Sequence, residues 1–142
     1  MASLDELRSF FARDFPQCTA TLEVVGEGRV RMRQEVGEAQ LRPGGTVSGP
    51  VMMTLADAAS YAIILAEIGI VPLAVTTSLT VNFLRRPSAD RAIVAEASLL
   101  KLGRRLAVTE MRIYSEGDDA LVAHATATYA IPPDARGDQK KV

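Results

Sequence analysis

The order of apolar and polar residues predicts one long apolar helix among six strands. From Pro50 to about Ile68 the chain is apolar or small, and Asp57 and Glu67 are its only charges. Pro50 suits the first turn of a helix, and Gly69 suits the position just after a helix ends. Asp57, Ser60 and Glu67 interrupt the stretch, so we expect a buried core helix rather than a membrane span.

The remaining elements are shorter. Ser3–Asp14 has the pattern of an amphipathic helix, with Ser3 as its cap and Glu6 three residues later. Alternating or β-branched runs predict strands over residues 19–25, 28–36, 74–84, 92–100, 106–114 and 121–131. Strands segregated from helices indicate an α+β fold with an antiparallel sheet, which we expect to curve around the long helix.

The 142 residues suit one domain, 1–142, with an N-terminal helix over 3–14, a core over 19–132 and a frayed tail over 133–142. A net charge of −1 gives no general attraction to nucleic acid or anionic membranes, and we expect neither as a partner. Single copies of cysteine and histidine, Cys18 and His124, argue against an internal disulfide framework and a Cys/His zinc site. The N-terminus lacks the apolar run of a signal peptide, so the expected location is cytoplasmic.

Four segments resemble the hotdog-fold thioesterases, in particular the branch of the phenylacetate-degradation (PaaI-like) thioesterases. They read PGGTVSGPVMMTLADAA, AVTTSLTVNFLRRP, KLGRRLAV and VAHATATYAIP, and together they span about residues 41–132. The resemblance implies a sheet of about six strands wrapped around the long helix, and hydrolysis of acyl-CoA thioesters without a cofactor beyond the CoA part of the substrate. It also implies a homodimer joined sheet edge to sheet edge, with sites at the interface and pairs of dimers in a tetramer.

The family's usual loop reads His-Gly-Gly, with a catalytic Asp nine residues after the His. By this resemblance Ser48 stands at the His position, Gly49 and Pro50 at the two glycines, and Asp57 at the catalytic acid. Asp57 would act as general base or nucleophile, and the Gly49 N–H would polarise the thioester carbonyl, because helix N-termini carry unpaired donors. From the residues alone, Ser48 is a helix cap rather than a nucleophile.

The resemblance assigns further positions. Thr76 falls at a polar position near the site, where it would reach the partner's Asp, although an ordinary strand threonine is equally consistent with the pattern. Substrate or CoA contacts fall on Pro50, Tyr61, Asn82, Phe83, Arg85, Lys101, Gly103 and Arg104. Together with Tyr61, the apolar residues Met52, Met53, Ile64 and Leu65 are candidates for an acyl pocket.

Two other functions remain as alternatives. The missing loop histidine favours a weak or inactive protein that only binds an acyl thioester, carried by CoA or by an acyl carrier protein. A dehydratase of the same fold normally needs a His with a carboxylate. His124, in the last strand, is better interpreted as a packed or edge histidine.

Overall fold

The structure is a computed structural model, and it is described for residues 1–133; the predicted tail, except for Pro133, lies outside the described residues. In chain order the elements are α1 (Leu4–Asp14), β1 (Thr21–Gly26), β2 (Arg29–Gln34), the 3₁₀ turn η1 (Glu38–Gln40), β3 (Leu41–Arg42), β4 (Thr46–Val47), α2 (Gly49–Ile68), β5 (Val75–Phe83), β6 (Ile93–Leu102), β7 (Leu106–Ser115) and β8 (Leu121–Ala130).

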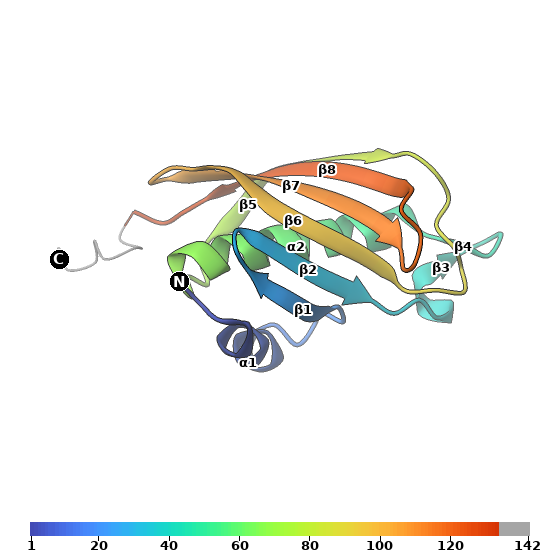
Figure 1. Cartoon of the computed structure of the whole chain (residues 1–142), viewed down its shortest axis with the longest axis horizontal. Coiled ribbons are helices and arrows are strands. Elements are labelled where there is room, and N and C mark those ends of the chain that lie inside the picture. Colours follow the sequence, from blue (N-terminus) through green and yellow to red (C-terminus); the bar gives the residue numbers. More distant parts are fainter. Residues whose placement is uncertain (134–142) are drawn as a thin grey trace.

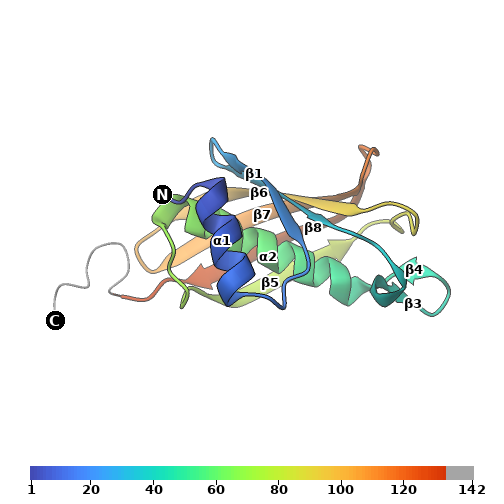
Figure 2. The ribbon, with the colours of Figure 1, turned by 90° about the horizontal axis from the view of Figure 1, so that it is seen from below.

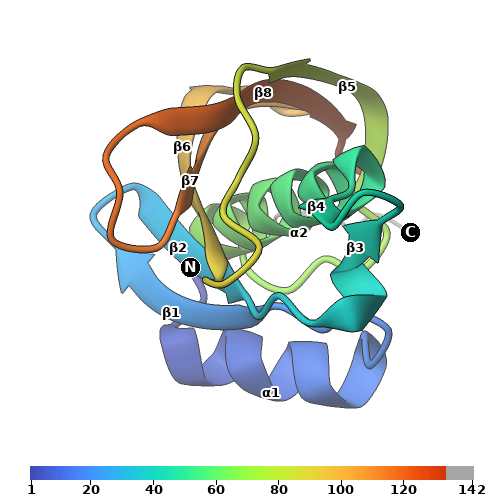
Figure 3. The ribbon, with the colours of Figure 1, turned by 90° about the vertical axis from the view of Figure 1, so that its right-hand side faces the viewer.

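Six strands form one antiparallel sheet in the order β1-β2-β6-β7-β8-β5. The sheet curves around α2, which lies along its inner face (Figure 1; Figure 3). The predicted α+β architecture, a hotdog fold with one central helix, is confirmed. The strands β1 and β5 form the two edges of the sheet, and β5 lies on the far side of α2 from β1 (Figure 3).

The ends of α2 follow from its sequence. Ser48 is the N-cap, and its Oγ accepts a hydrogen bond of 3.3 Å from the Val51 N–H. At the other end the Gly69 N–H donates to the Leu65 carbonyl, with a backbone φ of 96° that favours glycine. Ala59, Ile64 and Leu65 are completely buried, so the helix is the centre of the core.

Within residues 1–133, α2 is the one helix whose length and mean hydropathy of 1.6 would suit a membrane span. In this fold 61% of that stretch is buried against the protein's own sheet.

The helix α1 packs against β1 and the C-terminal part of α2, on the outer side of the β1 edge (Figure 1). The predicted capping box is present: the Ser3 Oγ accepts from the Glu6 N–H, and the Glu6 carboxylate accepts from the Ser3 N–H. Arg8 fixes the helix to the strand, because its guanidinium donates twice to the Leu22 carbonyl. The position of α1 brings aromatic side chains to the surface of α2.

Two local features were not predicted from the sequence. The strands β3 and β4 are only two residues long, too short for a periodic signal. Simple alternation over the strand predicted at residues 74–84 would also place Thr76 on the same face as Ser78, and the structure does not. An irregularity between Thr76 and Ser78 shifts the register, so Thr76 pairs with the buried Tyr129 and shares the inner face with Leu79.

Candidate functional site

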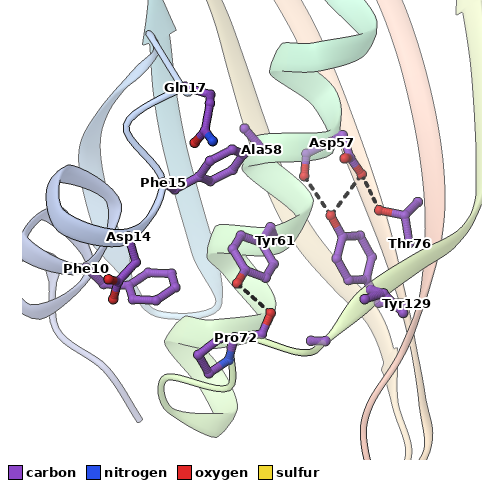
Figure 4. Close-up of a pocket in the computed structure, with 12 residues that line it drawn as sticks. Phe10, Asp14, Phe15, Gln17, Asp57, Ala58, Tyr61, Pro72, Thr76 and Tyr129 are labelled. Carbon is purple, nitrogen blue, oxygen red and sulfur yellow. Dashed lines mark hydrogen bonds between the residues drawn. The ribbon is translucent and has the colours of Figure 1, made fainter.

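Asp57 lies half-buried on α2 and receives two hydrogen bonds on the same carboxylate oxygen. The Thr76 hydroxyl and the Tyr129 hydroxyl each donate to Oδ1, and both hydrogen bonds are 2.8 Å long (Figure 4). Among residues 1–133, no side chain or backbone donor contacts Oδ2. The carboxylate is therefore fixed through one oxygen, and the other can meet a ligand.

Thr76 reaches this carboxylate within its own chain. The resemblance implied a contact with the partner's Asp; in the structure the shifted register of β5 places the Thr76 hydroxyl against Asp57 of the same molecule. Thr76 is thus a support of Asp57 and more than an ordinary strand threonine.

The second support, Tyr129, was missed in the sequence. Its side chain is 3% exposed, and its hydroxyl also lies 3.1 Å from the Asp57 backbone carbonyl. Burial, and then the neighbouring Asp57 carboxylate, raise the pKa of Tyr129 far above its ordinary value of 10, so it stays a hydrogen-bond donor. A signal was available: along β8 the inward positions are Ala123, Ala125 and Ala127, and Tyr129 ends this series of small residues with a large one.

A pocket of about 420 Å³ opens beside Asp57. One wall is α2 with Asp57, Ala58 and Tyr61, and a second wall comes from the start of β5 and from β8. The third wall is the end of α1 and the segment after it (Figure 4). The complete lining is Phe10, Asp14, Phe15, Gln17, Asp57, Ala58, Tyr61, Pro72, Ala74, Val75, Thr76 and Tyr129.

The pocket differs from the one expected on α2. Of the predicted acyl-pocket residues, Tyr61 lines it, and its hydroxyl donates to the Pro72 carbonyl over 3.0 Å. Met52, Ile64 and Leu65 face the core instead, with exposed fractions of 4% or less, because those positions point to the sheet. Met53 is 40% exposed and does not line the pocket.

Gly49 opens α2 at the far end of the same helix. No residue in the described part of the chain accepts a hydrogen bond from its N–H, as is usual in the first turn. A Cβ at this position would lie 3.4 Å from the ring of Phe83, at the end of β5. The Ser48 hydroxyl is engaged in the cap, so the backbone is the donor that this loop presents.

Gly49 and Asp57 are eight residues apart on one helix, and a rise of 1.5 Å per residue places them about 12 Å apart along its axis. That distance is too great for both to contact one carbonyl group. One chain therefore holds the predicted carboxylate and the predicted oxyanion donor in separate places.

The predicted CoA-binding residues are also divided. The β6–β7 hairpin holds Lys101, Gly103 and Arg104. This hairpin is close to the start of β5, because Leu106 pairs with Ala130 and Ala130 pairs with Val75. Arg85 follows the end of β5, about 25 Å further along the strand, and donates to the Leu121 carbonyl.

The last predicted contact, Asn82, pairs with His124 on the outer face of the sheet, away from the pocket. His124 forms a 2.8 Å hydrogen bond with Glu110 on that outer face, so it is not placed to act on a ligand beside Asp57. No group of three or more His, Cys, Asp or Glu side chains that could hold a metal ion occurs within residues 1–133.

Comparison with known proteins gives a consistent family. The model of the thioesterase superfamily matches residues 44–127. A crystal structure of a candidate thioesterase from Silicibacter is 45% identical, with a TM-score of 0.85 and 92% of each chain covered. No functionally curated protein matches the chain.

Two further structures extend the comparison. A variant of the phenylacetic acid degradation protein PaaI from Thermus thermophilus is 25% identical, with a TM-score of 0.72, covering 83% of this chain and 97% of the other. Zebrafish thioesterase superfamily member 2 is 22% identical, with a TM-score of 0.81 and coverages of 93% and 100%, and it supports the fold alone. The similarity to PaaI agrees with the branch that the sequence resembles.

Proposed function

The chain belongs to the thioesterase superfamily, which makes thioester hydrolysis its reaction class, and we propose that it hydrolyses an acyl-CoA to a free acid and coenzyme A. The observation that carries this proposal is the Asp57 carboxylate, held through Oδ1 by Thr76 and Tyr129 at the wall of a pocket, with Oδ2 open.

In the proposed reaction Oδ2 of Asp57 acts on the thioester carbon through water or directly. As a base it takes a proton from water while the hydroxyl attacks the carbonyl carbon, and the charge that develops on the carbonyl oxygen is met by the Gly49 N–H. The C–S bond then breaks, and the departing thiolate takes the proton that Asp57 accepted from water, which gives free CoA and restores the carboxylate. As a nucleophile Asp57 would form an acyl anhydride that water hydrolyses to the same products.

Because Gly49 and Asp57 are separated within one chain, the reaction needs two copies. We propose a homodimer in which Asp57 of one copy works with Gly49 of the other. Along α2, Pro50, Met53, Thr54 and Asp57 occupy partly or fully exposed positions one turn apart, which we call the uncovered stripe. The ribbon of α2 has a side that the sheet does not cover (Figure 2). Beside this stripe lies β5, an edge strand on which most residues are exposed.

The edge strand also supplies the geometry. When two identical strands pair antiparallel about their centre, near Leu79, each brings its end to the beginning of the other. The Phe83 end of β5 lies at Gly49, and the Thr76 end lies at Asp57. Such a pairing places Gly49 and Arg85 of one copy near Asp57 and the β6–β7 hairpin of the other. The pairing of dimers into a tetramer stays a prediction.

The first experiment is a screen of acyl-CoA thioesters for release of free thiol. We expect turnover by the wild type and a loss of at least about 100-fold in kcat for Asp57→Asn. Glu67→Gln is the matched control, because Glu67 lies on the same helix but does not line the pocket. Saturable acyl-CoA binding without turnover by the wild type would instead identify a binding protein, the alternative that the absent loop histidine favours.

The second experiment tests the shared site by mixing inactive subunits. Asp57→Asn and Gly49→Val should each be inactive alone, since one lacks the carboxylate and the other blocks the approach to the N–H. A mixed dimer restores one complete site if the two groups come from different chains. If the mixture stays inactive although mass spectrometry detects mixed dimers, the two-chain site is wrong.

A further inference from the structure

The wall of the pocket opposite Asp57 carries a second carboxylate, Asp14, at the last residue of α1 (Figure 4). Resting on the proposed acyl-CoA hydrolysis, we infer that this pocket selects acyl groups without a negative charge at their far end, and that Asp14 is the residue that excludes an anionic tip.

The direction of the acyl group follows from the position of Asp57. The reacting carbonyl has to lie against its free Oδ2, and the coenzyme has to leave toward the exposed edge strand. The acyl group then extends between α2 and α1, where Phe10 and Phe15 stand at the end of the pocket.

The middle of this path is apolar and aromatic. The ring of Tyr61 lies 6.2 Å from that of Phe10, 6.1 Å from that of Phe15 and 6.0 Å from that of Tyr129, measured between centroids. These rings offer a surface to an aliphatic or aromatic stem, because burying apolar area is favourable. Asp14 and the Gln17 amide are the polar groups that such a stem meets beyond the rings.

The charged side chains that line the pocket are both negative. Asp14 and Asp57 line the pocket, and no Lys, Arg or His is among its described lining residues. Arg13 forms a 3.1 Å ion pair with Asp14, but the side chains are 67% and 48% exposed, so solvent screens this pair and Asp14 keeps part of its negative charge. The field of Asp14 extends into the pocket: after burial, Asp14 is the second cause that raises the pKa of Tyr61.

A carboxylate at the tip of the acyl group would therefore approach a like charge in a pocket whose described lining contains no cation. Two unit charges about 5 Å apart in a solvated pocket repel enough to change affinity about three- to tenfold. An uncharged tip meets no such repulsion and can accept a hydrogen bond from Gln17 or donate one to Asp14.

The test uses stable thioether analogues, so that binding is measured without turnover. S-hexyl-CoA and S-(5-carboxypentyl)-CoA are titrated by calorimetry into the wild type, Asp14→Asn, Asp14→Lys and the control Asp5→Asn. Asp5 is also on α1 but does not line the pocket. We expect the wild type to bind the hexyl analogue more tightly than the carboxypentyl analogue. Asp14→Asn should reduce the ratio of these two affinities about three- to tenfold, and Asp14→Lys should reduce it further. Asp5→Asn should leave the ratio unchanged.

The inference is overturned if neither analogue binds, or if the ratio of the two affinities is the same in the wild type and both Asp14 variants. These results are distinct from failure of the proposed function. A protein that shows the ratio change but releases no thiol from any acyl-CoA would retain the selective pocket and lose the assignment as a hydrolase.

Discussion

Replacing Tyr129 with phenylalanine tests whether the support of Asp57 matters for activity. The change removes one hydroxyl and keeps the ring, which stacks on Tyr61 at 24° with a centroid distance of 6.0 Å. The lost contact is a 2.8 Å hydrogen bond to Asp57 Oδ1. The Thr76 hydroxyl still donates to that oxygen, so the carboxylate keeps one of its two supports.

The magnitude follows from the kind of hydrogen bond. A bond to a charged acceptor contributes about 1.5–3 kcal/mol, and each 1.4 kcal/mol corresponds to a factor of ten in rate. If about half of this free energy is expressed in the transition state, kcat falls about 3- to 12-fold while KM changes little.

The assay is release of free thiol at saturating substrate, with unfolding measured on the same samples. Tyr114→Phe is the control, because Tyr114 lies on the outer face of the sheet, away from Asp57. Thr76→Val should produce a loss of similar size. An unchanged kcat in folded Tyr129→Phe would refute the positioning role, and a lower melting temperature alone would show that the hydroxyl serves only stability.

Three further predictions concern the helix start, the core and the outer face. Gly49→Ala should stay folded, within about 0.5 kcal/mol by chemical denaturation, while kcat/KM falls at least about tenfold, because the new methyl group crowds the approach to the N–H. Ser60→Ala and Thr109→Val should each lower the free energy of unfolding by about 1–3 kcal/mol, because the two hydroxyls form a fully buried 2.7 Å hydrogen bond. In a double-mutant cycle, the double variant should lose less unfolding free energy than the two single variants added together. The hydrogen bond from His124 lowers the pKa of Glu110 below its ordinary value of 4.5. The folded protein therefore gains stability above pH 4.5, and it loses this contribution as the pH falls through the lowered pKa. Glu110→Gln should flatten this part of a curve of unfolding free energy against pH.

The sequence predicted the elements of this fold because their signals are local. The Ser3–Glu6 capping box, the Ser48 cap and the Gly69 stop each depend on residues within one turn, and all three occur as expected. The long apolar run of α2 could only be buried inside a broad surface, and six strand patterns supplied it.

Less of the candidate site could be predicted from the sequence, because its residues come together through strand register and helix packing. Asp57 came from the resemblance and from its isolated charge. Its contact with Thr76 depends on an irregularity in β5, and its contact with Tyr129 depends on the pairing of β5 with β8. The third wall of the pocket required the docking of α1, for which the positions of Phe10 and Phe15 in the chain give no direct signal.

The loop at the start of α2 departs from the family's pattern, yet the structure limits what that departure removes. Ser48 places its hydroxyl on the Val51 N–H, so its side chain stabilises the helix start, while Pro50 removes a donor at the next position only. The Gly49 N–H remains, and the open end of the helix adds its partial positive charge. If the two copies pair through β5 as proposed, this end faces the partner's Asp57 across the uncovered stripe of α2. The uncovered stripe of α2 and the separation of Gly49 from Asp57 then have one explanation: a second copy covers the stripe and supplies the missing half of each site.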